Sequence, residues 1–174
     1  MRRRADRRRI ERFARELGRL TREPATLYLS GGATAVLLGW RPSTIDIDVR
    51  LEPERDELLR AIADLKERLA LNIELASPLD FIPEPPGWRD RSPFVAQEGP
   101  LTVRHMDPYA QVLAKIERGH ALDEADVAAM LTQGLVEPRE GLRLFAAIEP
   151  ELYRFPAIDA PSFRRRIEEA LRAG

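Results

Sequence analysis

The stretch LYLSGGATAVLLGWRPSTIDIDVRL, residues 27–51, contains the features from which the fold of this chain can be predicted. A short apolar run ends in the turn Ser30-Gly31-Gly32, and a helix is predicted over residues 33–40. The alternating run Ile45-Asp46-Ile47-Asp48-Val49 follows and predicts a strand. Because alternate residues of a strand share a face, both aspartates are expected on one face and the three apolar side chains in the core.

Two carboxylates side by side on one rigid strand repel each other, and a cation between them relieves that repulsion. Hard divalent ions take oxygen ligands and commonly hold substrate phosphates as well, so Asp46 and Asp48 predict a site for Mg²⁺ or Mn²⁺. Gly31 and Gly32 lack Cβ atoms and allow close backbone approach, and their amides at a helix start would attract anions. The combination suits a nucleoside triphosphate with its metal ion.

These residues resemble the nucleotidyltransferase superfamily related to DNA polymerase beta. In that superfamily a Gly-Gly or Gly-Ser turn is followed, after a short spacer, by an Asp-apolar-Asp/Glu-apolar strand. Here the spacer is residues 33–45, at the upper end of the family's range. Thr44 stands just before this strand and gives the run Thr-Ile-Asp-Ile-Asp, which resembles the same region of the small bacterial abortive-infection and toxin–antitoxin nucleotidyltransferases.

The resemblance implies an α/β (α+β) fold, with a mixed sheet flanked by helices and a helical C-terminal part. It implies transfer of a nucleoside monophosphate from an NTP to an acceptor hydroxyl of RNA, tRNA or a protein, and an antitoxin as a further partner. Asp46 and Asp48 would hold the metal. The residues expected to bind the nucleotide from this region are Ser30, Gly31, Gly32 and Thr44.

A third catalytic carboxylate is expected on a neighbouring strand, and Glu74 in the alternating run 71–76 is the candidate. It could help to hold metal and accept the proton of the attacking hydroxyl. The family more often has Asp at this place, so an exposed strand charge remains an equal interpretation. Asp80 is the second choice.

A second set of candidates lies further along the chain. Lys115 and Arg118 are three residues apart and share a helix face, as do Asp123 and Asp126 on the next predicted helix. From the residues alone this is a structural ion-pair network. The resemblance implies more: the lysine contacts the triphosphate and the aspartates orient basic groups, so Lys115, Arg118 and Asp126 are predicted to bind nucleotide.

Composition excludes several kinds of site. The 174 residues include no cysteine, so disulfides and thiolate metal sites are excluded, and with only His105 and His120 a His-rich zinc site is not expected. No stretch is long and apolar enough to span a membrane, and the N-terminus lacks the apolar run of a secretory signal, so a cytoplasmic location is expected. Residues 1–9 hold six arginines and one aspartate, which favours either a solvated helix start or contact with phosphate backbones.

The remaining pattern predicts two parts packed as a single compact unit, a core with the N-terminal helix over residues 1–106 and a helical part over 107–174. Residues 83–93 are expected to form a loop, with Trp88 either in the core or stacked on a base, and Asp123 is expected to cap a helix. Further elements are expected at residues 5–21, 54–70, 94–96, 101–103, 107–118, 137–148 and 162–171.

Three other interpretations remain open. The chain could be a catalytically inactive nucleotide-binding or protein-interaction module of the same fold. It could modify a small molecule such as an antibiotic, or the two motifs could coincide in an unrelated α/β domain.

Overall fold

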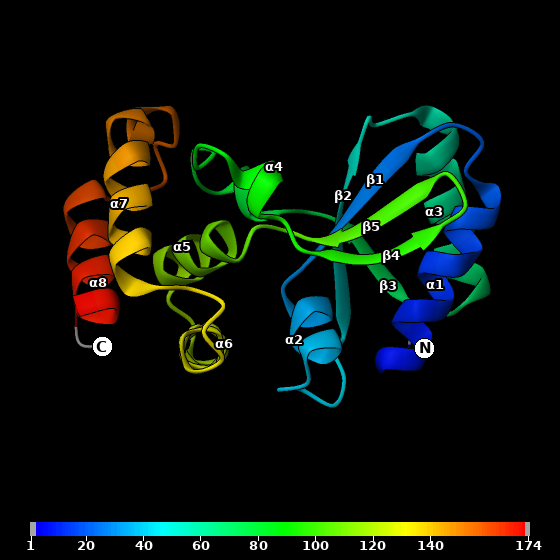
Figure 1. The fold of residues 1–174 in the computed structure, drawn as a ribbon, viewed down its shortest axis with the longest axis horizontal. Coiled ribbons are helices and arrows are strands. Elements are labelled where there is room, and N and C mark those ends of the chain that lie inside the picture. Colours follow the sequence, from blue (N-terminus) through cyan, green and yellow to red (C-terminus); the bar gives the residue numbers. More distant parts are fainter. Residues whose placement is uncertain (1–2, 173–174) are drawn as a thin grey trace. The chain divides into compact units, whose positions relative to one another are not determined.

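The computed structural model describes residues 3–172 and divides the chain into two compact units (Figure 1). Unit 1 is the chain up to Ser77 together with Ser92–His105; unit 2 is Pro78–Arg91 and the chain from Met106 onward. The sequence-based boundary at residue 106 assigns residues 78–91 to the first part, whereas the structure places them in unit 2.

Unit 1 is built on a five-stranded sheet in the order β3-β2-β1-β5-β4. β1 runs antiparallel to β2 and parallel to β5, while β3 joins β2 in parallel and β4 joins β5 in antiparallel pairing. This mixed sheet, flanked by helices, confirms the predicted fold class. The strands are β1 (Ala25–Ser30), β2 (Asp46–Glu52), β3 (Asn72–Leu75), β4 (Phe94–Glu98) and β5 (Leu101–His105), and the helices are α1 (Arg7–Leu20), α2 (Gly32–Leu38) and α3 (Asp56–Arg68).

Helices α1 and α3 pack against each other and against one face of this sheet (Figure 1). In α1 the buried Ile10, Phe13 and Leu17 recur at spacings of three and four, which places them on one side of the helix. The helix begins after Asp6, whose carboxylate accepts a hydrogen bond from the backbone N–H of Arg9 (2.9 Å) and so caps the helix. The buried apolar side chains of α1, α3 and the sheet form the core of unit 1.

Strand β2 separates a buried face from a more accessible one. Ile47, Val49 and Leu51 are buried, while Asp46 and Asp48 alternate with them and are half-buried. The prediction for Ile45 was wrong: it lies before the strand begins and is 60% exposed, because alternation fixes the face of a side chain only within paired strand backbone.

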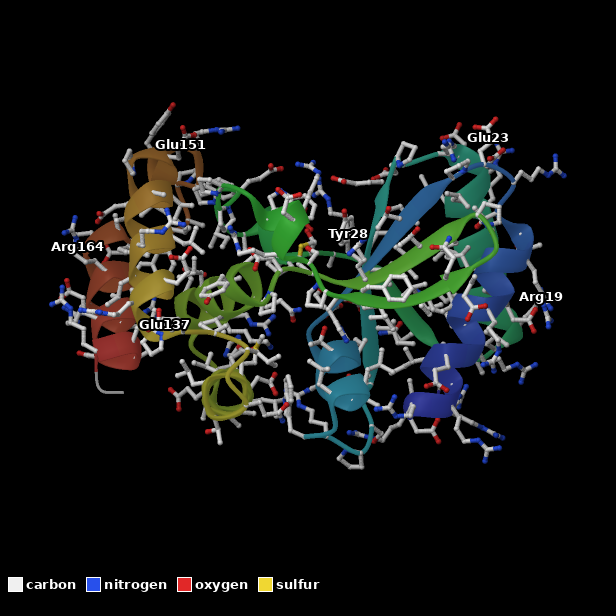
Figure 2. The ribbon with its side chains drawn as sticks, in the orientation of Figure 1. Arg19, Glu23, Tyr28, Glu137, Glu151 and Arg164 are labelled. Atoms are coloured by element: carbon white, nitrogen blue, oxygen red, sulfur yellow. The ribbon has the colours of Figure 1, made fainter. Side chains whose placement is uncertain are left out.

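Unit 2 is helical. Its elements are η1 (Pro78–Asp80), α4 (Trp88–Arg91), α5 (Pro108–Arg118), α6 (Ala121–Thr132), α7 (Pro138–Ile148), η2 (Glu149–Arg154) and α8 (Ala160–Arg172), where η denotes a 3₁₀-helix. Asp107 caps α5 by accepting from the N–H of Tyr109 (3.0 Å), and Glu137 (labelled in Figure 2) caps α7 in the same way. Among the described residues, no helix has the length and apolar character needed to cross a membrane.

Two predictions in this region were wrong. The expected loop 83–93 contains the short helix α4. Of the two positions considered for Trp88 within this segment, the structure has the core one, because its side chain is 2% exposed. Asp123 is the third residue of α6, whose N-cap position is His120, so it does not cap that helix. Its carboxylate is directed to basic residues of α5 instead.

Candidate functional site

The turn between β1 and α2 requires glycine for two separate reasons. Gly31 has φ +60° and ψ −128°, a backbone conformation that L side chains rarely adopt. Gly32 has no such φ, but a Cβ there would lie 2.0 Å from Oγ1 of Thr44. Thr44, itself buried, donates its hydroxyl to the carbonyl oxygen of Asp46 (2.9 Å). Gly32 therefore lets the turn pack directly on the residue that leads into the aspartate strand.

The same turn lies against Asp48. A Cβ on Gly31 would approach Oδ2 of Asp48 to 2.8 Å, and Ser30 is the register partner of Asp48 in the antiparallel pair of β1 and β2. Ser30 is 4% exposed. The structure thus brings Ser30, Gly31, Gly32 and Thr44 together with Asp46 and Asp48.

Strand β3 adds two polar side chains to this face. The parallel register aligns Asp46 with Asn72 and Asp48 with Glu74, so the four side chains lie on one face of the sheet. The amide of Asn72 donates to Oδ1 of Asp46 and, at 3.1 Å, to Oε1 of Glu74. Asn72 was not predicted as a site residue, although its alternation with Glu74 would have identified it.

The donor set fits one of the known ways of holding Mg²⁺. Magnesium is usually bound through one or two carboxylates, with water and substrate phosphates as the other ligands. Asp46 and Asp48 supply such a pair, half-buried and on one strand. Within residues 3–172, no group of three or more histidine, aspartate or glutamate side chains is placed to hold a metal ion.

The remaining candidates lie in unit 2, in an ion-pair network between α5 and α6 in which Lys115, Asp123 and Asp126 are buried and Arg118 is exposed. The amine of Lys115 donates to Asp126 (2.8 Å) and to Asp123 (3.3 Å). The guanidinium of Arg118 binds both oxygens of Asp123, at 2.8 and 2.6 Å. Asp80, the second choice for a third carboxylate, is also in unit 2.

Charge is balanced within this network. Burial disfavours the ionised form of Asp123, but the hydrogen bonds and positive charges of Arg118 and Lys115 outweigh it and hold its pKa below the usual value. The Lys115 side chain is 9% exposed and its amine lies between two carboxylates. These contacts match the ion-pair interpretation, and nucleotide binding by Lys115, Arg118 and Asp126 stays a prediction from the resemblance.

No curated protein and no solved structure gives a significant match to this chain. One family model matches residues 8–137, a span that runs from α1 to the N-cap of α7 and includes every candidate residue described above. Since this span is well over half of the chain, the protein belongs to the family described as nucleotidyltransferase of unknown function (DUF6036).

Proposed function

We propose that the protein transfers a nucleoside monophosphate from a magnesium-bound NTP to an acceptor hydroxyl. The observation that supports this most strongly is the packing of the Gly31-Gly32 turn on Asp48 and Thr44, which joins a turn open to phosphate with a pair of metal-binding carboxylates. Membership of a nucleotidyltransferase family supports the same chemistry.

In the proposed reaction the acceptor oxygen forms a bond to the α-phosphorus while the bond from that phosphorus to the bridging oxygen breaks, and pyrophosphate leaves with the electron pair. Asp46 and Asp48 would hold Mg²⁺, which neutralises phosphate charge and orients the reacting oxygens. The Gly31-Gly32 turn would admit the phosphates close to the backbone.

Glu74 is proposed to accept the proton of the attacking hydroxyl. It is exposed and is the register partner of Asp48 on the adjacent strand, so a substrate oxygen could reach both side chains. Asn72 would position the group, because its amide spans Asp46 and Glu74. Catalysis would then depend mainly on positioning and electrostatics, as in other phosphoryl-type transfers.

The test is calorimetric titration of each NTP with Mg²⁺ into wild type and the double variant Asp46→Asn/Asp48→Asn. The control is Glu57→Gln/Asp64→Asn, which removes the same charge from exposed positions on α3. We expect saturable, magnesium-dependent binding that the first variant loses and the control keeps. Absence of NTP binding by folded wild type, with Mg²⁺ or Mn²⁺, would contradict the proposal.

Turnover separates an enzyme from an inactive module of the same fold. Wild type incubated with α-labelled NTP and pooled RNA or protein should label an acceptor, and Glu74→Gln should reduce labelling far more than NTP affinity. Binding without transfer to any acceptor would favour the module.

A role as the toxin of a toxin–antitoxin or phage-defence system is the finer proposal that the resemblance supports. It predicts that expression of wild type slows bacterial growth and that Asp46→Asn/Asp48→Asn relieves the effect at equal protein level. Equal growth arrest by both proteins would contradict a toxic activity at this site.

A further inference from the structure

A hollow lined by arginines lies at the surface of unit 1, outside the site described above. It has a volume of about 520 Å³ and is formed by Arg3, Arg9, Arg12 and Arg68 around the backbone of residues 69–71. We call it the arginine hollow. No carboxylate lines it, so its walls carry positive charge only.

The charges of the hollow are only weakly neutralised by the protein. Among the described residues Arg12 forms no ion pair. Arg68, whose side chain is 59% exposed, has one distant partner, the half-buried Glu16 at 3.9 Å. Exposed pairs of this kind contribute little. The cationic groups therefore remain available to an external anion.

One wall of the hollow, formed by Arg9, is held in place. The guanidinium of Arg9 donates to the carbonyl oxygens of Leu69 and Ala70, and the backbone N–H of Arg3 donates to Ala70 (3.0 Å). A guanidinium has five N–H donors, so Arg9 keeps donors for a ligand after binding these two carbonyls. Pre-arranged guanidinium groups are well suited to phosphate oxygens.

Its position links it to the carboxylate face. Residues 69–71 run directly into Asn72, whose amide donates to Asp46, so the hollow borders the end of the sheet at which β2 and β3 begin. The N-terminal segment is held at the same end, because Ala5 and Thr44 exchange backbone hydrogen bonds of 2.7 and 2.9 Å. Residues 69–71 form the turn that ends α3, in which the backbone N–H groups of Ala70 and Leu71 donate to the carbonyl oxygens of Glu67 and Lys66 at 3.1 Å each.

We propose that the arginine hollow binds the phosphodiester backbone of a nucleic-acid acceptor and directs its terminal hydroxyl toward Asp46 and Asp48. The proposed ligand is a nucleic acid because four arginines and no carboxylate line the hollow, and planar guanidinium forks bind phosphate oxygens; an acidic protein partner is an outcome of the test. The role as acceptor rests on the proposed function; binding of the phosphate backbone does not.

The test is binding of a short labelled single-stranded RNA, and of the same sequence as DNA, followed by fluorescence anisotropy over a salt series. The hollow variant is Arg12→Ala/Arg68→Ala, in which both residues are exposed and their loss leaves the core intact. Each phosphate contact contributes about 0.7 to the slope of log affinity against log salt for a single strand. Loss of two contacts should lower the slope by about 1.4 and the affinity near 0.1 M salt by about 25-fold.

The matched control is Arg22→Ala/Arg60→Ala, which removes two exposed arginines from unit 1 outside the hollow. Arg22 follows the C-terminal end of α1, and Arg60 is in the first half of α3. The control should bind RNA like wild type. RNA and DNA should bind similarly if only phosphates are read, and tighter RNA binding would add a contact to the 2′-hydroxyl.

Three results would overturn the proposal. The first two are RNA affinity that is unchanged in the hollow variant, and RNA affinity that falls as much in the control variant as in the hollow variant. The third is displacement of labelled RNA by polyglutamate as effectively as by unlabelled RNA, which would indicate an acidic protein partner. NTP affinity, measured in parallel by calorimetry, should be the same in the hollow variant and wild type. Wild type that binds RNA but no NTP would reject the proposed function alone, and wild type that binds NTP but no RNA would reject the hollow alone.

Discussion

At Gly32 the absence of one methyl group allows the turn to pack on Thr44. We predict that Gly32→Ala lowers the free energy of unfolding by about 1–3 kcal/mol, because overpacking forces the neighbouring chain to move. Urea unfolding measures this change. The turn carries residues of the proposed nucleotide site, so NTP affinity should fall as well.

A double-mutant cycle isolates the cause. In a Thr44→Gly background, the cost of Gly32→Ala should largely disappear, since the atoms that the new Cβ meets are gone. Gly39→Ala is the comparison: its φ of +96° strains any side chain, but no atom lies within 4 Å of the new Cβ, so its cost should not change with Thr44. A Gly32→Ala cost that is the same in both backgrounds would show that contact with Thr44 is not the reason for glycine here.

His105 should make stability depend on pH. It is buried at the end of β5 with Nδ1 3.0 Å from the Thr34 hydroxyl, and burial lowers its pKa from 6.5 to about 4. The unfolded chain therefore binds this proton at higher pH than the folded chain. Above pH 6.5 the free energy of unfolding is not reduced by His105. As pH falls toward 4, protonation of His105 in the unfolded chain lowers the free energy of unfolding, by up to about 3 kcal/mol in total.

Chemical unfolding at several pH values between these limits measures the loss. His105→Gln should flatten the pH dependence in this window, whereas His120→Gln, at an exposed position, should leave it as in wild type. If the free energy of unfolding changed with pH in the same way in wild type and His105→Gln, His105 would not be the cause of the pH dependence.

At the scale of elements, α5 and α6 are joined by the Lys115 network. We predict that Lys115→Met destabilises the protein by about 3–5 kcal/mol, because Asp126, 1% exposed, would lose its ammonium partner and remain buried. Urea unfolding should show a lower midpoint, and adding Asp126→Leu should recover part of the loss by removing a buried carboxylate that has lost its lysine partner.

Lys66→Met, the same substitution at a half-buried position on α3, is the control and should cost much less. If Lys115→Met were as stable as wild type, the lysine would not be needed for packing, and its predicted role in nucleotide binding would become the better explanation.

The elements show where sequence patterns were sufficient. Strand β2 and helix α1 were predicted because each has a clear period, two for the strand and three to four for the helix. Helix α4 was missed because it has only four residues, too few to show a period, in a segment rich in proline. Asp123 was placed at a helix start because aspartate is a common cap; its buried contacts with Lys115 and Arg118 depend on how the helices pack, which the sequence does not state.

The same limit applies to the candidate site. Asp46 and Asp48 were identified because alternation and the preceding glycines are local signals. Strand pairing brings Asn72 onto that face, and the contact of Arg9 with residues 69–70 forms the arginine hollow at the end of the sheet where β3 begins; both join residues far apart in sequence. Local patterns contain no information on such pairings.

At the scale of the whole molecule, each unit has buried apolar residues of its own. Phe13 lies in the core of unit 1, and Phe163 of unit 2 is fully buried edge-to-face with Phe145, ring centroids 5.0 Å apart. Residues 78–91 leave the first unit and join the second before the chain returns to β4. A single boundary at residue 106 does not describe this excursion, because which unit a segment packs on depends on contacts between residues far apart in sequence.

Two separate cores predict two separable unfolding transitions, and the chain has one tryptophan in each unit to follow them. Trp40 reports on unit 1 in a Trp88→Phe background, and Trp88 reports on unit 2 in a Trp40→Phe background. Phe163→Ala should lower the urea midpoint seen by Trp88, and Phe13→Ala the midpoint seen by Trp40, each through a cost of about 3–5 kcal/mol.

Magnesium-bound NTP should raise the Trp40 midpoint first, because Asp46 and Asp48 belong to unit 1. Coincident midpoints that move together with either substitution would mean that the units unfold as one, and that loss of packing in the helical unit is transmitted to the carboxylate face.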